Sequence, residues 1–148
     1  MDSRIAGLDT AEKCDNFAAN AERLDRNDLA IQARNRKLEI KAELYGAKTQ
    51  AEKEALQAVY AYEEILSAKN GKRTRATRTW QMIRKYGIIE AVERAVDRPV
   101  ETMGYTALVD KGLERHAFEA VIIRHPELFS DSALTVSQKR ITSWKAGK

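Results

Sequence analysis

The amino-acid sequence predicts an all-α protein, a compact multi-helix domain of about six to seven helices. Apolar residues recur at spacings of three and four along most of the chain, as on one face of a helix. No stretch shows the sustained alternation of a strand, and only 7 glycines and 2 prolines interrupt the 148 residues. This length favours one compact domain, or two very small ones.

The first helix is predicted to begin near Asp9, because its carboxylate and Glu12 three residues later resemble a capping box. An apolar stripe follows on one face of this helix, formed by Cys14, Phe17, Ala18, Ala21 and Leu24. A second helix is predicted to begin at a cap provided by Asp25 or Asn27 and to end at Gly46. Its inner side carries Leu29, Ala33, Ile40 and Leu44.

The third helix is predicted to begin at Thr49, which forms a full capping box with Glu52, and to end at Gly71. Residues 1–68 are therefore interpreted as an N-terminal helical unit, a helical hairpin plus one helix. Residues 69–148 are interpreted as a basic C-terminal helical unit that packs with the first unit as one domain.

The C-terminal unit is predicted to start with a basic helix over residues 74–86, capped by Thr74 or Thr77. A series of shorter helices is then expected over residues 88–96, 105–110, 113–123 and 131–144, the last capped by Asp131 or Ser132. Arg98-Pro99 and His125-Pro126 are expected to end the helices that precede them, because a proline disfavours helical backbone in the residue before it.

Positive charge is concentrated in one part of the chain. The formal net charge is +4, but residues 1–68 hold 10 basic and 13 acidic side chains, and residues 69–148 hold 16 basic and 9 acidic ones. Residues 69–85, called the basic segment below, hold seven basic residues and no acidic one. Such a segment can attract nucleic acid, an anionic lipid surface or an acidic protein.

The basic segment predicts a non-enzymatic, nucleic-acid-binding protein, with DNA favoured over RNA. The candidate phosphate contacts are Lys69, Lys72, Arg73, Arg75, Arg78, Arg84 and Lys85. If residues 74–87 are helical, one face presents Arg75, Arg78, Met82 and Lys85, and Ala76, Trp80, Ile83 and Gly87 lie roughly opposite. The alternative is a solvated helix face, although solubilising faces usually mix acidic with basic residues.

The basic helix, Gly87 and the helix after it have the outline of a helix-turn-helix. The second helix is acidic, however, because it carries Glu90, Glu93 and Asp97, and Glu93 occupies a position where an apolar residue is expected. The basic helix and the arm before it are therefore better candidates for contact with DNA than the second helix.

The sequence contains no recognisable catalytic motif, and we expect neither a metal nor a cofactor. His116 and His125 are nine residues apart, a spacing that does not pair them as ligands on one helix, and surface positions are predicted for both. Cys14 is the only cysteine and lies on an apolar stripe, so we expect a buried, inert thiol in a reducing compartment.

The asymmetry of charge also permits a second interpretation, a protein–protein interaction or accessory module, including a homodimer. Its candidate contact aromatics are Tyr60, Tyr62, Trp80 and Tyr86. No apolar run approaches the roughly 18 residues of a membrane span, so we expect a cytoplasmic protein without a membrane partner.

Overall fold

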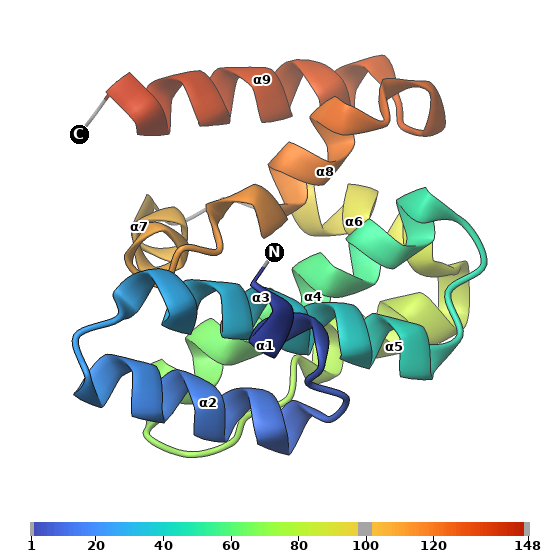
Figure 1. The fold of residues 1–148 in the computed structure, drawn as a ribbon. Helices are drawn as coiled ribbons and strands as arrows, with labels where there is room; N and C mark the ends of the chain where they lie inside the picture. Colours follow the sequence, from blue (N-terminus) through green and yellow to red (C-terminus); the bar gives the residue numbers. More distant parts are fainter. Residues whose placement is uncertain (1, 98–101, 147–148) are drawn as a thin grey trace.

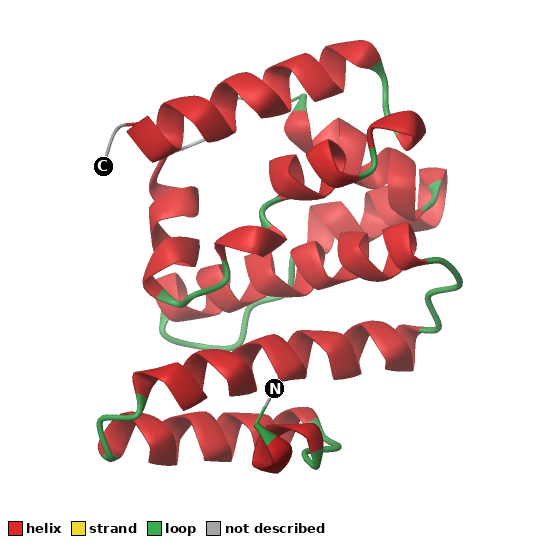
Figure 2. Cartoon of the chain, turned by 45° about the horizontal axis from the view of Figure 1, so that its top comes forward, coloured by secondary structure: helices red, strands yellow, loops and turns green. Residues whose placement is uncertain are grey.

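The computed structural model describes residues 2–97 and 102–146 of the chain, and it confirms the predicted all-α class. Every regular element in these ranges is helical, and short loops join the helices (Figure 2). The predicted number of six to seven helices is too low, because nine α-helices and two 3₁₀ turns occupy the described residues. The elements are α1 Ser3–Ala6, α2 Ala11–Arg23, α3 Asn27–Tyr45, α4 Gln50–Asn70, α5 Thr77–Tyr86, α6 Ile88–Val96, α7 Thr102–Asp110, η1 Glu114–His116, α8 Phe118–Arg124, η2 Pro126–Leu128 and α9 Asp131–Ala146.

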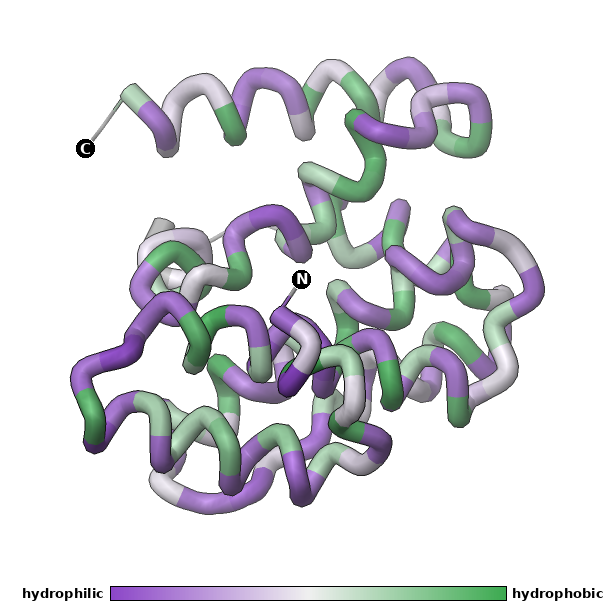
Figure 3. Tube along the Cα trace, in the orientation of Figure 1, coloured by the Kyte–Doolittle hydropathy of each residue, from purple (hydrophilic) through white to green (hydrophobic). Residues whose placement is uncertain are grey.

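Helix α4 is central to the packing, since it contacts α3, α6, α7 and α8. Small buried side chains at Ala55, Ala58 and Ala61 let the neighbouring helices approach closely. Ala55 and Ala58 belong to one apolar cluster with Val92 of α6 and Val121 of α8. Hydrophobic positions recur between hydrophilic ones along the helices, as expected when one face of each is buried (Figure 3).

Helices α2 and α3 form an antiparallel hairpin at the lower edge of the molecule, and α9 lies at the opposite edge (Figure 1). Alanines dominate the hairpin contact, with Ala18 and Ala21 on α2 facing Ala30 and Ala33 on α3 in a cluster that also holds Ile5, Leu29 and the half-buried Leu8 and Phe17. Two predicted inner residues are wrong, because Leu24 is 68% exposed and Leu44 is 82% exposed. Leu24 is the C-cap residue of α2, and Leu44 lies in the last turn of α3.

The helix caps are partly as predicted. Thr49 Oγ1 accepts a 3.1 Å hydrogen bond from the Glu52 N–H, as its capping box predicts. The cap of α2 is Thr10 rather than Asp9, because its hydroxyl accepts from the Lys13 N–H at 3.1 Å. Neither predicted side chain caps α3, whose N-cap residue is Arg26.

The predicted helix 113–123 is interrupted in the structure. Ala117, at φ −59° and ψ 143°, has extended backbone and separates η1 from α8. Helix α8 ends before His125-Pro126, as predicted, and the Ser130 hydroxyl accepts from the Ala133 N–H near the start of α9, a role predicted for Asp131 or Ser132. Helix α6 ends at Val96, and Arg98-Pro99 lies outside the described residues.

Residues on both sides of position 68 contribute to one apolar cluster. Leu56 and Val59 of α4 pack there with Trp80 and Ile83 of α5 and Ala91 of α6. Helix α4 thus supports the helical part of the basic segment. Among the described residues, no helix combines the length and the apolar character needed to cross a membrane.

Candidate functional site

The basic segment begins where α4 ends. Gly71 follows α4 with φ +70°, a left-handed conformation that glycine adopts without steric cost. The loop after it is bound back to α4 by one serine. Ser67 Oγ accepts a 2.8 Å hydrogen bond from the Thr74 N–H and donates at 3.3 Å to the Thr74 carbonyl. Asn70 Nδ2 donates to Thr74 Oγ1, which itself donates to the Lys72 carbonyl.

A buried carboxylate holds the start of α5. Glu63 Oε2 accepts from the Ala76 N–H at 2.8 Å and from the Trp80 indole Nε1 at 2.6 Å. Arg75 Nε lies 3.5 Å from the same oxygen, and the guanidinium of Arg75 partly compensates the negative charge of Glu63. Burial of a carboxylate is costly unless such partners are present. Because these partners lie in the loop after Gly71 and in α5, Glu63 holds both segments against α4.

The predicted basic helix is shorter than the sequence indicates, because α5 begins at Thr77 rather than residue 74. Arg75 therefore precedes the helix and does not share its face with Arg78 and Lys85. The predicted caps are also wrong: the N-cap residue is Ala76, and Thr74 is occupied by its contacts with α4.

The two sides of α5 differ, but the predicted assignment holds only in part, because Gly87, expected on the inner side, is exposed. Ala76, Trp80 and Ile83 are buried and pack in one cluster. Thr79 is also buried, and the exposed residues on the outer side are Arg78, Gln81, Arg84 and Lys85. Met82, predicted on the cationic face, is half-buried because it packs against the same cluster as Trp80.

All seven predicted phosphate contacts are exposed in the structure. Arg75 is the only one of them with a described carboxylate within 4.0 Å, and its guanidinium lies 5.2 Å from the Trp80 ring centroid. Lys69 lies in the last turn of α4, and Arg78, Arg84 and Lys85 lie on α5. The structure brings Lys72, Arg73 and Arg75 together around one pocket.

That pocket has a volume of about 640 Å³ and lies between α2, α3, α4 and the loop after Gly71. It adds three cations that the sequence reasoning missed: Lys37 and Lys41 of α3, and Lys111. Lys37 bonds to Asp15 Oδ1 at 2.9 Å and Glu64 Oε2 at 3.0 Å, whereas Lys41 Nζ lies over the Tyr60 ring, 4.9 Å from its centroid. The one-turn spacing of Lys37 and Lys41 is visible in the sequence, but the packing that surrounds them is not.

The charged side chains of α6 pair with neighbouring residues, although Glu90 and Arg94 are exposed. Glu90 bonds to Arg94 Nε at 2.9 Å, and Arg94 lies 3.7 Å from the centroid of the Tyr86 ring. Glu93 Oε1 accepts from the Ser130 N–H at 2.8 Å. Helix α6 therefore presents a mainly acidic surface with paired charges, whereas the exposed charged residues of α5 are all basic.

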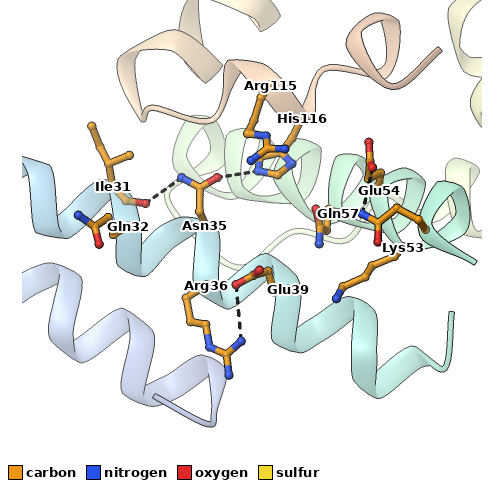
Figure 4. Close-up of a pocket in the computed structure, with 11 residues that line it drawn as sticks. Ile31, Gln32, Asn35, Arg36, Glu39, Lys53, Glu54, Gln57, Arg115 and His116 are labelled. Atoms are coloured by element: carbon orange, nitrogen blue, oxygen red, sulfur yellow. Dashed lines mark hydrogen bonds and ion pairs between the residues drawn. The ribbon is translucent and has the colours of Figure 1, made fainter. Parts of the chain in front are cut away.

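A second pocket, of about 480 Å³, is lined by polar side chains of α3, α4 and η1 (Figure 4). His116 and Asn35 point toward each other there, with 2.7 Å between His116 Nε2 and Asn35 Oδ1. His116 was predicted at the surface but is only 4% exposed, and burial lowers its pKa to about 4. Asn35 Nδ2 donates to the Ile31 carbonyl, so Asn35 Oδ1 is the acceptor and a neutral His116 carries its proton on Nε2.

Glu54 borders the same pocket and is held as a carboxylate. Burial by itself raises the pKa of Glu54, but hydrogen bonds from Gln50 and Arg124 outweigh this and lower it to about 2. His125 Nε2 lies 3.2 Å from Glu54 Oε1, near enough for an ion pair but without a hydrogen bond. Within the described residues, no three acidic, histidine or cysteine side chains gather as metal ligands would.

The thiol of Cys14 is buried, as predicted, and burial raises its pKa.

Two of the aromatics predicted to contact a protein partner are covered in the structure, because Trp80 is buried and Tyr60 is half-buried, whereas Tyr62 and Tyr86 are exposed. Trp144 of α9 stacks on Tyr105 of α7 with 5.1 Å between ring centroids. Comparison of the chain with protein-family models, with curated proteins and with solved structures found no match.

Proposed function

We propose that this chain is a non-enzymatic nucleic-acid-binding protein that contacts the phosphate backbone through the basic segment. The observation that supports this function is the state of the seven cations: all are exposed, and six have no described carboxylate within 4.0 Å. Free cations of this kind can replace the counterions that surround a phosphate backbone.

The anchoring of the segment adds to the argument. Ser67 holds the loop, and Glu63 holds the start of α5, so the charges are carried on backbone that is fixed to α4. A fixed array loses less conformational entropy on binding than a flexible charged loop. Contacts to the backbone alone carry no direct base information, so we expect weak sequence preference.

The test is a titration of a random-sequence DNA duplex with purified protein over a range of salt concentrations. Five to seven phosphate contacts predict a slope of about −4 to −6 for log K against log salt. The same titration with a single strand and with duplex RNA compares the three polymers, and duplex DNA is expected to bind best. Absence of binding at low salt, or binding that salt does not weaken, would overturn the proposal.

A further inference from the structure

The pocket beside the basic segment holds more positive than negative charge. Its cations come from α3, the loop after Gly71 and the turn after α7: Lys37, Lys41, Lys72, Arg73, Arg75 and Lys111. Its four carboxylates are Glu12, Asp15, Glu63 and Glu64. Three of the four are already engaged, because Lys37 binds Asp15 and Glu64, and Glu63 binds the start of α5.

Among the cations of this pocket, Lys41 combines partial burial with the lack of a nearby described carboxylate. It is half-buried, yet no described carboxylate lies within 4.0 Å of its Nζ, which lies over the Tyr60 ring, 4.9 Å from the ring centroid. Burial lowers the pKa of Lys41, and the charges of Lys37 and Arg73 lower it further, although Glu63 and Glu64 act in the opposite direction. An anion placed between Lys41 and Arg73 would favour the charged form of Lys41, which would offset both the cost of its burial and the repulsion from Arg73.

We propose that this pocket binds the terminal phosphate of a nucleic-acid strand, with Lys41 and Arg73 as its principal contacts. The inference rests on the proposed function, because the exposed cations of the basic segment would hold the rest of the strand. A terminal phosphate monoester carries up to about two negative charges, compared with one for each phosphate inside the strand. A pocket with a surplus of cations therefore favours the end of a strand over its interior.

The loop gives this pocket a fixed wall. Thr74 is bonded to Ser67 and Asn70 of α4, so Lys72 and Arg73 extend from backbone held at both sides. The hydroxyl of Ser67 is committed to Thr74, and the cationic side chains are the charged donors that line the pocket. Phosphate recognition by lysine and arginine uses such charge-assisted hydrogen bonds.

The experiment compares single DNA strands of one short sequence, phosphorylated at the 5′ end, at the 3′ end or at neither, by fluorescence anisotropy at low salt. The wild-type protein is expected to bind one phosphorylated strand about tenfold more tightly than the unphosphorylated strand. Lys41→Met keeps the apolar stem beside Tyr60 and is expected to abolish this preference. Lys85→Met, the same change outside the pocket, should weaken all three strands and keep the preference.

A free phosphate group has the same chemistry, so inorganic phosphate and a nucleoside monophosphate are titrated into ¹⁵N-labelled protein as a second arm. Saturable shifts at residues of the pocket, absent in Lys41→Met, support a phosphate site there. If no strand binds, the proposed function fails, and the source of the phosphate is a small molecule rather than a strand. Equal affinity for the three strands and no shifts with either small anion overturn the pocket and leave backbone binding standing. If the Lys41→Met protein fails to fold, the titration of the small anions is done with the wild-type protein alone. A lack of chemical-shift changes at the pocket residues then contradicts the proposed phosphate site.

Discussion

The indole Nε1 of Trp80 donates a 2.6 Å hydrogen bond to Oε2 of Glu63, and both side chains are buried. The same oxygen accepts the Ala76 N–H, so one carboxylate of α4 sets both the position of α5 and the direction from which its backbone starts. The exposed side of α5, which carries Arg78 and Lys85, is oriented through this contact.

Replacement of Glu63 by alanine is expected to lower the free energy of unfolding by about 2–6 kcal/mol. The substitution leaves a buried indole N–H and a backbone N–H without an acceptor, and such groups cost about 1–3 kcal/mol each. Glu63→Gln retains an acceptor oxygen and is expected to cost less. Urea unfolding measures the change, with the exposed Glu127→Ala as the control, expected within about 0.5 kcal/mol of wild type. Equal stability of the Glu63→Ala and Glu127→Ala proteins would show that the contact does not hold α5.

Single replacements of Arg78, Arg84 and Lys85 by glutamine are expected to weaken nucleic-acid binding without affecting the fold. Each lost phosphate contact should make the slope of log K against log salt shallower by about 0.9. The melting temperature should stay close to that of wild type, because exposed charges contribute little to stability. Salt titrations and thermal melts of the three variants check both halves, and an unchanged slope in all three would contradict the interface.

Arg75→Gln separates the structural from the binding role of a cation in the same segment. Its Nε lies 3.5 Å from Glu63 and its guanidinium lies over the Trp80 ring, so its loss should cost up to about 1 kcal/mol of stability as well as affinity. Urea unfolding alongside the Arg78→Gln protein measures the difference. A loss of stability in the Arg78 variant that equals the loss in the Arg75 variant would be inconsistent with the contacts of Arg75.

The features that the sequence predicts correctly are local ones. Capping by Thr49, the helix stop at Gly46 and the buried side of α5 around Trp80 and Ile83 depend on residues within a few positions of each other. Met82 departs from its predicted side because α5 buries a wider surface than a helical wheel of the charges alone indicates.

The features that the sequence reasoning missed depend on contacts between distant parts of the chain. His116 is buried because Asn35, 81 positions earlier, supplies its hydrogen-bond partner. The pocket beside the basic segment joins Lys41 of α3 to Arg73 of the loop, and no run of charge marks that relationship. The run of charge along the chain indicates the exposed cations of the basic segment but does not indicate Lys41, which is half-buried.

The stability of the fold is expected to fall with pH between about 6.5 and 4 because of His116. Burial lowers its folded pKa from 6.5 to about 4, so within this window the unfolded chain binds a proton that the folded chain excludes. The full effect amounts to at most about 3 kcal/mol, lost as pH falls through the window. Glu54, with a pKa lowered from 4.5 to about 2, extends the loss to lower pH.

Urea unfolding at a series of pH values measures this effect. His116→Gln, which can still donate toward Asn35, should remove the dependence between pH 6.5 and 4 that His116 contributes. His125→Gln leaves His116 in place, so this variant should retain the pH dependence that His116 contributes. A His116→Gln protein with the pH dependence of wild type would show that this histidine titrates alike in the folded and unfolded chains.

Gly112→Ala is expected to destabilise the protein more than Gly71→Ala, although the two glycines have nearly the same backbone conformation, with φ of +71° and +70°. A left-handed conformation costs an alanine about 1–2 kcal/mol at either position. At Gly71 nothing lies within 4 Å of the added Cβ, whereas at Gly112 three carbons of the Ile31 side chain lie 2.6–2.8 Å from it. Displacing that side chain should cost about 1–3 kcal/mol more.

Urea unfolding of the two variants isolates the steric part of the cost, since the conformational part is shared. Ile31→Ala combined with Gly112→Ala should be less destabilised than the sum of the two single changes, because removal of the branched side chain makes room for the new methyl group. Equal stability of the Gly71 and Gly112 variants, or strict additivity with Ile31→Ala, would contradict the close approach of α3 to the turn after α7. The stabilities of the two glycine variants therefore test the packing that places Lys111 in the pocket beside the basic segment, and the test needs no binding measurement.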